Sequence, residues 1–206
     1  MAAQNSSGNL RSKGVGLAGL VVGLAVIPCI WFGDTELSMG LAQMELPGDI
    51  DKAVQISEVF AHGPSVLAIL ATVWWIDIER RRKILFAGGM TLLSSLVANS
   101  LKYVFSRVRP HSADIVDGSA SWLPLFHGSF WDSTQRSFPS GHSATAVALA
   151  IGLSIVYPRG KFFFATFAIL ACLQRIVSQA HYPSDVLAGI AIALLCCSVC
   201  MIWSPR

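Results

Sequence analysis

Six apolar stretches are the feature of this sequence that most restricts its fold. They carry almost no Asp, Glu, Lys or Arg, and they approach the roughly 20 residues that a helix needs to cross a bilayer. The stretches are residues 14–32, 59–76, 84–101, 143–157, 162–180 and 186–203. We therefore expect an all-α fold, an integral membrane bundle of six transmembrane helices formed by a single domain over residues 1–206.

The composition supports this expectation and argues against an ordinary soluble enzyme. Charged residues make up 13% of the 206 residues, whereas soluble domains carry about a quarter. Hydrophobic residues make up 53%, and the mean hydropathy is +0.58. Too few charges are present to cover a surface that faces water on all sides.

Three of the stretches need a further argument. Residues 143–157 are short, and residues 162–180 contain Arg175, which is costly in a bilayer unless it faces protein or water. We expect both to be helices whose outer ends line a wet cavity. Residues 14–32 follow two cations, as a signal sequence would, but they are too long for a signal core and lack a small-x-small cleavage site. We expect a retained helix.

The cations predict the orientation, because short cytoplasmic loops retain Lys and Arg. With six spans, one side would hold both termini and the cations Arg11, Lys13, Arg80, Arg81, Arg82, Lys83, Arg159, Lys161 and Arg206. The other side would hold the smaller set Lys52, Lys102, Arg107, Arg109, Arg136 and Arg175. We therefore expect cytoplasmic termini. The basic run at residues 80–83 is then a topology anchor, and we expect no nucleic acid partner.

In this topology, the polar residues of the later segments fall together at the outer side. They are Lys102, Arg109, Ser140, His142, Arg175, His181 and Asp185. Random placement would scatter them over both membrane faces. Their convergence predicts a site that processes an anion.

Lys102 and Arg109, which precedes Pro110, place two cations where the third span ends. Arg offers a fork of donors that matches phosphate oxygens, whereas Lys acts as a point charge. Alternatively, both side chains anchor a helix end to lipid headgroups.

Ser140, Gly141 and His142, after Pro139, open the fourth span. Ser is a favoured N-cap and Gly lets a ligand approach the backbone, so the free amides and the helix dipole can hold an anion beside His142. The alternative is a capped helix with an interfacial histidine.

Arg175, His181 and Asp185 form the third motif, with His181 in a turn and Asp185 at the start of the sixth span. A carboxylate close to an imidazole fixes its tautomer through one ring nitrogen and makes the other more nucleophilic. His181 is the candidate nucleophile. The triple could also be a structural ion pair.

In this order, the three motifs resemble the signature of the type 2 phosphatidic acid phosphatase superfamily. The motifs cover residues 102–185, and the six-span pattern extends the likeness to nearly the whole chain. One residue departs from the family pattern, because Gln174 stands where the family usually has Ser. We expect it to change the support of Arg175 and the substrate preference without removing the chemistry.

The resemblance implies a phosphatase that works through a phosphohistidine, with no metal and no other cofactor. His181 would attack phosphorus, Asp185 would orient His181, and His142 would protonate the leaving group. The phosphoryl oxygens would be held by Lys102, Arg109, Ser140, Gly141 and Arg175. No HExxH pattern, paired Asp cluster or Cys/His grid points to a metal instead.

The implied substrates are undecaprenyl pyrophosphate, phosphatidylglycerol phosphate, phosphatidic acid or the phosphate of lipid A. The implied location is a bacterial cytoplasmic (inner) membrane, with the active site at the extracytoplasmic face. The partners are the lipid substrate and the bilayer, and the oligomeric state is open. Three alternatives share the anion pocket: a lipid phosphotransferase, a non-catalytic phospholipid carrier, and a vanadium-dependent haloperoxidase, against which six spans argue.

Overall fold

The computed structural model describes residues 2–44, 46–112, 121–127 and 131–203, and helices dominate these residues. The longer helices are α1 (Ala2–Phe32), α4 (Gly63–Ile76), α5 (Arg81–Leu101), α6 (Gly141–Val156), α7 (Lys161–Val177) and α8 (Pro183–Met201). Short helices α2 (Asp34–Ala42) and α3 (Gly48–Ile56) follow α1, and 3-10 turns join the rest: η1 (Ser57–Phe60), η2 (Ile78–Arg80), η3 (Pro110–Ser112), η5 (Ser133–Gln135) and η6 (Pro158–Gly160). The expected all-α class is confirmed.

Four of the described helical segments are long and apolar enough to cross a membrane. They are Leu10–Phe32, Ile78–Leu101, Pro158–Val177 and Pro183–Met201. The pair Gly48–Phe60 and Gly63–Ile76 would add a fifth span, although it is bent by 73°. Helix α6 is also apolar, but it has only 16 residues. By length and composition the chain is an integral membrane protein with four or five candidate spans, compared with the six expected.

The predicted stretches overlap helices, but two helix ends differ for identifiable reasons. Helix α4 begins at Gly63 rather than at residue 59, because Pro64 in its first turn has no N–H to bond to a preceding turn. Helix α7 ends at Val177 rather than at residue 180, and Gln179 has a positive φ of 54°. A left-handed residue ends an α-helix.

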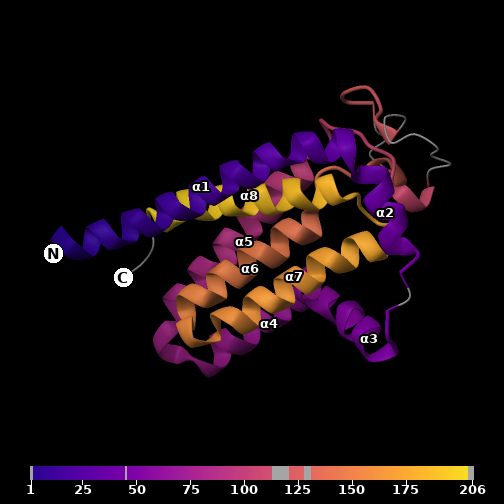
Figure 1. Cartoon of the computed structure of the whole chain (residues 1–206). Helices are drawn as coiled ribbons and strands as arrows, with labels where there is room; N and C mark the ends of the chain where they lie inside the picture. The colour runs from indigo at the N-terminus through magenta and orange to yellow at the C-terminus, as the bar shows by residue number, and fades with distance from the viewer. Residues whose placement is uncertain (1, 45, 113–120, 128–130, 204–206) are drawn as a thin grey trace.

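Helices α1 and α8 lie side by side along their length (Figure 1). Ser12 Oγ donates to the carbonyl oxygen of Ser198 at 2.8 Å, and Ser198 Oγ donates to that of Ser12 at 3.0 Å. A Cβ on Gly16 would lie 2.6 Å from Ser198 Oγ, so the small residue permits the close approach. The beginning of α1 and the end of α8 thus share one end of the molecule.

Helix α6 lies at the centre of the bundle, in contact with α5, α7 and α8 (Figure 1). Its buried residues are mostly small, and a Cβ on Gly152 would lie 2.7 Å from the Cβ of Ala87 in α5. Small side chains let membrane helices pack closely. The N-terminus of α6 points away from the end marked by Ser12 and Ser198 and toward α2 and the polar loops (Figure 1).

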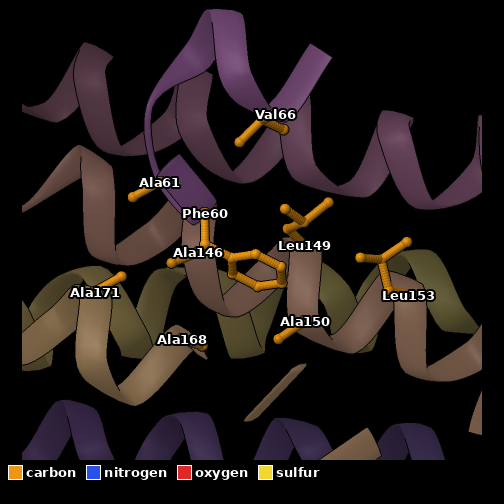
Figure 2. Close-up of a cluster of buried hydrophobic side chains, with 9 residues drawn as sticks. All are labelled: Phe60, Ala61, Val66, Ala146, Leu149, Ala150, Leu153, Ala168 and Ala171. Carbon is orange, nitrogen blue, oxygen red and sulfur yellow. The ribbon is translucent and has the colours of Figure 1, made fainter. Parts of the chain in front are cut away.

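The turn before α4 is fixed to this core by its own side chains. Phe60 and Ala61 are buried against residues of α6 and α7, and Figure 2 shows the Phe60 ring inserted among them. The cluster comprises Phe60, Ala61, Val66, Ala146, Leu149, Ala150, Leu153, Ala168 and Ala171. Turn η1, which immediately precedes Ala61, is therefore held beside the N-terminal half of α6.

Candidate active site

A polar cavity of about 410 Å³ opens beside the N-terminus of α6. Lys102, Arg109, Gly141 and His142 line it, four of the residues singled out from the sequence. His62, Ser95, Asn99, Ser133 and Arg136 also line it. The end of α5, the following loop, the start of α4 and the start of α6 therefore contribute to one site.

The N-terminus of α6 is capped as its sequence suggests. Ser140 is the N-cap, and its Oγ accepts from the backbone N–H of Ser143 at 3.3 Å and from Ser143 Oγ at 2.9 Å. A Cβ on Gly141 would lie 2.8 Å from Asn99 Oδ1, so glycine allows α5 to approach this turn. Free N–H groups at a helix N-terminus are suited to bind an anion.

Helix α8 meets the same turn closely. The N–H of Ser140 donates to the backbone oxygen of Asp185 at 2.9 Å. A Cβ on Gly189 would overlap the carbonyl oxygen of Ser140. The absence of a side chain at Gly189 therefore lets the start of α8 carry Asp185 up to the start of α6.

His181 lies in the turn between α7 and α8 and is 1% exposed. Its Nδ1 is 3.5 Å from Asp185 Oδ2 and 3.4 Å from Ser137 Oγ, and its Nε2 has no hydrogen-bond partner among the described residues. Burial lowers the pKa of His181 to about 4, aided by the positive charges of Lys102 and Arg109 and opposed by its hydrogen bond to Asp185. The imidazole is therefore neutral near pH 7, with one nitrogen available.

Asp185 is fully buried and its carboxylate has several donors. Oδ2 accepts from Ser137 Oγ at 2.5 Å and from the N–H of Tyr182 at 2.9 Å, the latter as part of the capping of α8. Oδ1 accepts from Arg107 Nη1 at 2.7 Å. These bonds fix the carboxylate beside His181.

Arg107 is a central residue that the sequence interpretation treated only as a loop cation. It is completely buried between the rings of Trp122 and Tyr182, at 4.6 and 3.8 Å from their centroids. Its guanidinium joins Asp185 to Asp34, whose Oδ2 lies 2.8 Å from Arg107 Nη2. One positive charge thus lies between two buried carboxylates and offsets part of their negative charge.

Asp34 begins α2, in the segment between the first two predicted spans (residues 33–58, the first loop), and it was not a predicted site residue. It is 2% exposed, and it accepts the N–H of Ser184 at 2.8 Å as well as the Ser184 hydroxyl. Arg107 Nη1 also donates to Ser184 Oγ at 2.8 Å. The first loop thus helps to position the start of α8.

Two cations, Lys102 and Arg109, face the cavity and have no carboxylate partner among the residues that the structure describes. Burial and the positive charge of Arg109 together lower the pKa of Lys102 to about 8. Arg109 Nε is buried and has no hydrogen-bond partner among the described residues. An unpaired buried donor is costly and indicates a place for an anion.

Arg175 is placed differently, because it already has partners. Its Nε donates to Gln174 Oε1 at 2.5 Å, and its Nη2 donates to Glu58 Oε1 at 2.8 Å. The same Glu58 oxygen is 3.9 Å from His142 Nε2. Gln174, the residue that departs from the family pattern, therefore supports Arg175 directly.

His62 and Arg136 were not predicted to be site residues. The rings of His62 and His142 are stacked with centroids 6.5 Å apart. Arg136 lines the cavity, and its Nη1 donates to the hydroxyl of Tyr103 at a distance of 3.4 Å. Within the described part of the chain, no group of three or more His, Cys, Asp or Glu residues is placed to hold a metal ion.

Comparison with known proteins identifies similar chains. Residues 83–206 match the PAP2 superfamily. Lipid A 1-phosphatase of Rhizobium johnstonii is 42% identical over 101 residues, which are 48% of this chain and 39% of that protein. The chain thus spans less than half the length of that relative.

Two further similarities cover more of the chain. Decaprenylphosphoryl-5-phosphoribose phosphatase of Mycobacterium tuberculosis is 31% identical over 156 residues, which are 73% of this chain and 78% of that protein. The crystal structure of Aquifex aeolicus LpxE has a TM-score of 0.63 and 25% sequence identity, and the match covers 81% of this chain and 93% of that one.

Proposed function

The chain belongs to the PAP2 superfamily, and from this premise we propose that it hydrolyses a phosphomonoester or pyrophosphate of an amphiphilic lipid. The relatives named above are phosphatases, and the apolar helices place the protein in the bilayer where a lipid substrate resides. The substrate class is undecaprenyl pyrophosphate, phosphatidylglycerol phosphate, phosphatidic acid or lipid A.

We propose that residues 1–206 form one domain with six spans, in which α6 and the bent α3–α4 pair complete the set. The termini are cytoplasmic, and the cavity opens at the extracytoplasmic face of a bacterial inner membrane. The cation distribution supports this orientation. So does the placement of the cavity at the end of the bundle opposite to Ser12 and Ser198.

In the proposed reaction, His181 Nε2 attacks phosphorus and forms a P–N bond as the bond from phosphorus to the leaving oxygen breaks. His142, which must enter this step protonated, donates its proton to that oxygen, and the negative charge of the bound phosphate favours the protonated form. Water then attacks the phosphohistidine, His142 accepts a proton from the water, and the P–N bond breaks to release inorganic phosphate. General acid and base catalysis by one histidine in successive steps satisfies the proton balance.

The cations supply the electrostatic part of the mechanism. Lys102, Arg109 and Arg175 bind the phosphoryl oxygens together with Ser140 and the N–H of Gly141. Charge spreads over these oxygens during phosphoryl transfer, so fixed donors stabilise the transition state more than the ground state. The unpaired Nε of Arg109 supports this assignment most directly.

The observation that carries the proposal is the geometry of His181, a buried imidazole whose Nδ1 lies 3.5 Å from Asp185 Oδ2, while Nε2 has no hydrogen-bond partner among the described residues. A protein that only carries a lipid has no need for such a pair. A phosphotransferase would use the same phosphohistidine with a lipid hydroxyl in place of water.

The test measures phosphate release from a panel of these lipids by purified protein in detergent with EDTA. We expect release by the wild type and none by His181→Ala, with the exposed His127→Ala as the matched control that retains activity. Transfer of the phosphoryl group to an added lipid alcohol would favour the phosphotransferase. Lipid binding without release or transfer would favour the carrier.

A further inference from the structure

Glu58 brings a negative charge to the site that is proposed to bind a phosphate. It lies in η1, and its Oε1 is 2.8 Å from Arg175 Nη2 and 3.9 Å from His142 Nε2. Both partners have roles at the phosphoryl group in the proposed reaction. The Glu58 carboxylate therefore lies beside two side chains that are proposed to act on the substrate.

The backbone of Glu58 is held in place rather than free to withdraw. Phe60, two residues later, is 6% exposed within the cluster of Figure 2, and Ser57 Oγ donates to the carbonyl oxygen of Val54 at 2.6 Å. The side chain of Glu58 itself is 40% exposed. Only the side chain has room to change its position.

A phosphate that enters the site would compete with the Glu58 carboxylate for Arg175. Two of the three nitrogens of Arg175 are engaged, Nε by Gln174 and Nη2 by Glu58. A phosphoryl oxygen that binds Arg175 Nη2 would lie next to the Glu58 carboxylate. Two negative charges that contact the same nitrogen repel each other strongly in a partly buried site. Nη2 carries a second N–H group, but a phosphoryl oxygen bound to it would still lie beside the Glu58 carboxylate, so binding of one anion at Arg175 weakens binding of the other.

A second cavity provides space for the displaced side chain. It has a volume of about 320 Å³, and its lining includes Glu58, Gln174, Gln55 and Ser178. Gln55 Nε2 donates to Asp51 Oδ2 at 2.7 Å and keeps a second N–H for the Glu58 carboxylate, and water can also donate to it. Ser178 Oγ already donates to the backbone oxygen of Arg175 at 3.4 Å. Rotation of Glu58 into this cavity would release Nη2, while Gln174 keeps Arg175 oriented.

On the basis of the proposed function, we infer that Glu58 is an internal anion that competes with the phosphoryl group for Arg175 and so limits the affinity of the site for phosphate. Its consequence is weak retention of the inorganic phosphate product. When phosphate departs, the carboxylate returns to Arg175 and replaces it. Glu58 is in this sense a specificity-determining residue rather than a catalytic one.

The test compares wild type with Glu58→Gln, which keeps the size of the side chain and removes its charge. We expect the inhibition constant of inorganic phosphate against lipid turnover to fall about tenfold, as expected for removal of a repulsion of about 1.4 kcal/mol. Calorimetric titration of inorganic phosphate into the protein in detergent should show the same tightening. Glu79→Gln in η2 is the matched control, because it makes the same substitution at an exposed carboxylate at the other end of the bundle.

An unchanged or higher inhibition constant in Glu58→Gln would overturn the inference, and so would an equal effect of Glu79→Gln. Glu58→Asp, which keeps the charge but is too short to maintain the bond to Arg175, should give an intermediate affinity and tests the inference if the Gln variant does not fold. Calorimetry needs no turnover. Absence of turnover in the wild type would therefore count against the proposed function alone, and the phosphate titration would still decide the role of Glu58.

Discussion

Arg107 Nη1 lies 2.7 Å from Asp185 Oδ1, and this buried ion pair fixes the carboxylate that faces His181. The other guanidinium terminus binds Asp34, so one arginine joins the first loop to the first turn of α8. A charge that is this well enclosed cannot be removed without leaving its partners uncompensated. Arg107 is thus a positioning residue whose effect reaches the proposed nucleophile through Asp185.

Replacement of Arg107 by Met should destabilise the protein and reduce turnover. Loss of one partner of a buried ion pair costs about 3–5 kcal/mol, and here two carboxylates lose their cation. A thermal melt in detergent should show a clearly lower Tm, with kcat reduced in the fraction that remains folded. Arg82→Met at the opposite end serves as the control. An unchanged Tm in Arg107→Met would contradict the description of this pair.

The predicted charge state of Lys102 leads to a pH dependence. Its pKa in the folded protein is about 8, compared with about 10.5 for a free lysine. Below pH 8 the ammonium is present and can bind phosphate, and above pH 8 it is lost, so kcat/KM should fall on the alkaline side with a midpoint near pH 8. Lys102→Arg should shift this midpoint upward by more than about one unit, because arginine stays protonated.

The control for this pH profile is Lys161→Arg, at the other end of the bundle. It should leave the alkaline midpoint unchanged. If kcat/KM depends on pH in the same way in Lys102→Arg and in the wild type, a group other than Lys102 causes the loss of activity at alkaline pH.

Two parts of this architecture could be predicted from the sequence, and for different reasons. The helices follow from local composition, since long uncharged runs can only form helices in a bilayer. The N-cap at Ser140 and the place of His181 before α8 also follow from local signals, the Ser-Gly pair and Pro183. The prediction was wrong at two ends: the second span was extended over η1, which a bend separates from α4, and the fifth was extended beyond Val177, where α7 ends.

The support of the site could not be predicted in the same way. Asp34 and Ser184 are 150 positions apart, and Arg107 and Asp185 are 78 positions apart. No local pattern distinguishes Asp34 from its acidic neighbours, or Arg107 from the nearby Arg109. One signal was available for Arg107, since a cation next to a motif arginine in an outer loop has no topological function. No such signal was available for Glu58, because a single acid in a loop of polar and apolar residues is usually exposed to solvent.

Substitution of Gly189 by Ala should impair the site through packing alone. The added Cβ would overlap the carbonyl oxygen of Ser140 and push α8 away from α6. Overpacking of this kind costs about 1–3 kcal/mol, and separation of Asp185 from the start of α6 should also reduce kcat. Gly89→Ala in α5 is the control, because no atom lies within 4 Å of its added Cβ. Equal Tm and kcat values for the two variants would refute the close approach.

The support that Gln174 gives to Arg175 can be tested with Gln174→Leu. Hydrogen bonds to charged groups contribute about 1.5–3 kcal/mol, so loss of the bond to Arg175 Nε should reduce kcat/KM by about tenfold or more. The nearby Leu173→Ala, which alters an exposed apolar side chain, should have a much smaller effect. Unchanged kcat/KM in Gln174→Leu would show that Glu58 alone orients Arg175.

The most direct test of the central claim is to trap the phosphorylated protein. Purified protein in detergent would be mixed with a lipid whose scissile phosphate is radiolabelled, quenched in alkali, where phosphohistidine is stable, and digested to locate the label. We expect a label on His181 in the wild type and none in His181→Gln. A label on another residue, or phosphate release by His181→Gln at the wild-type rate, would contradict the phosphohistidine mechanism.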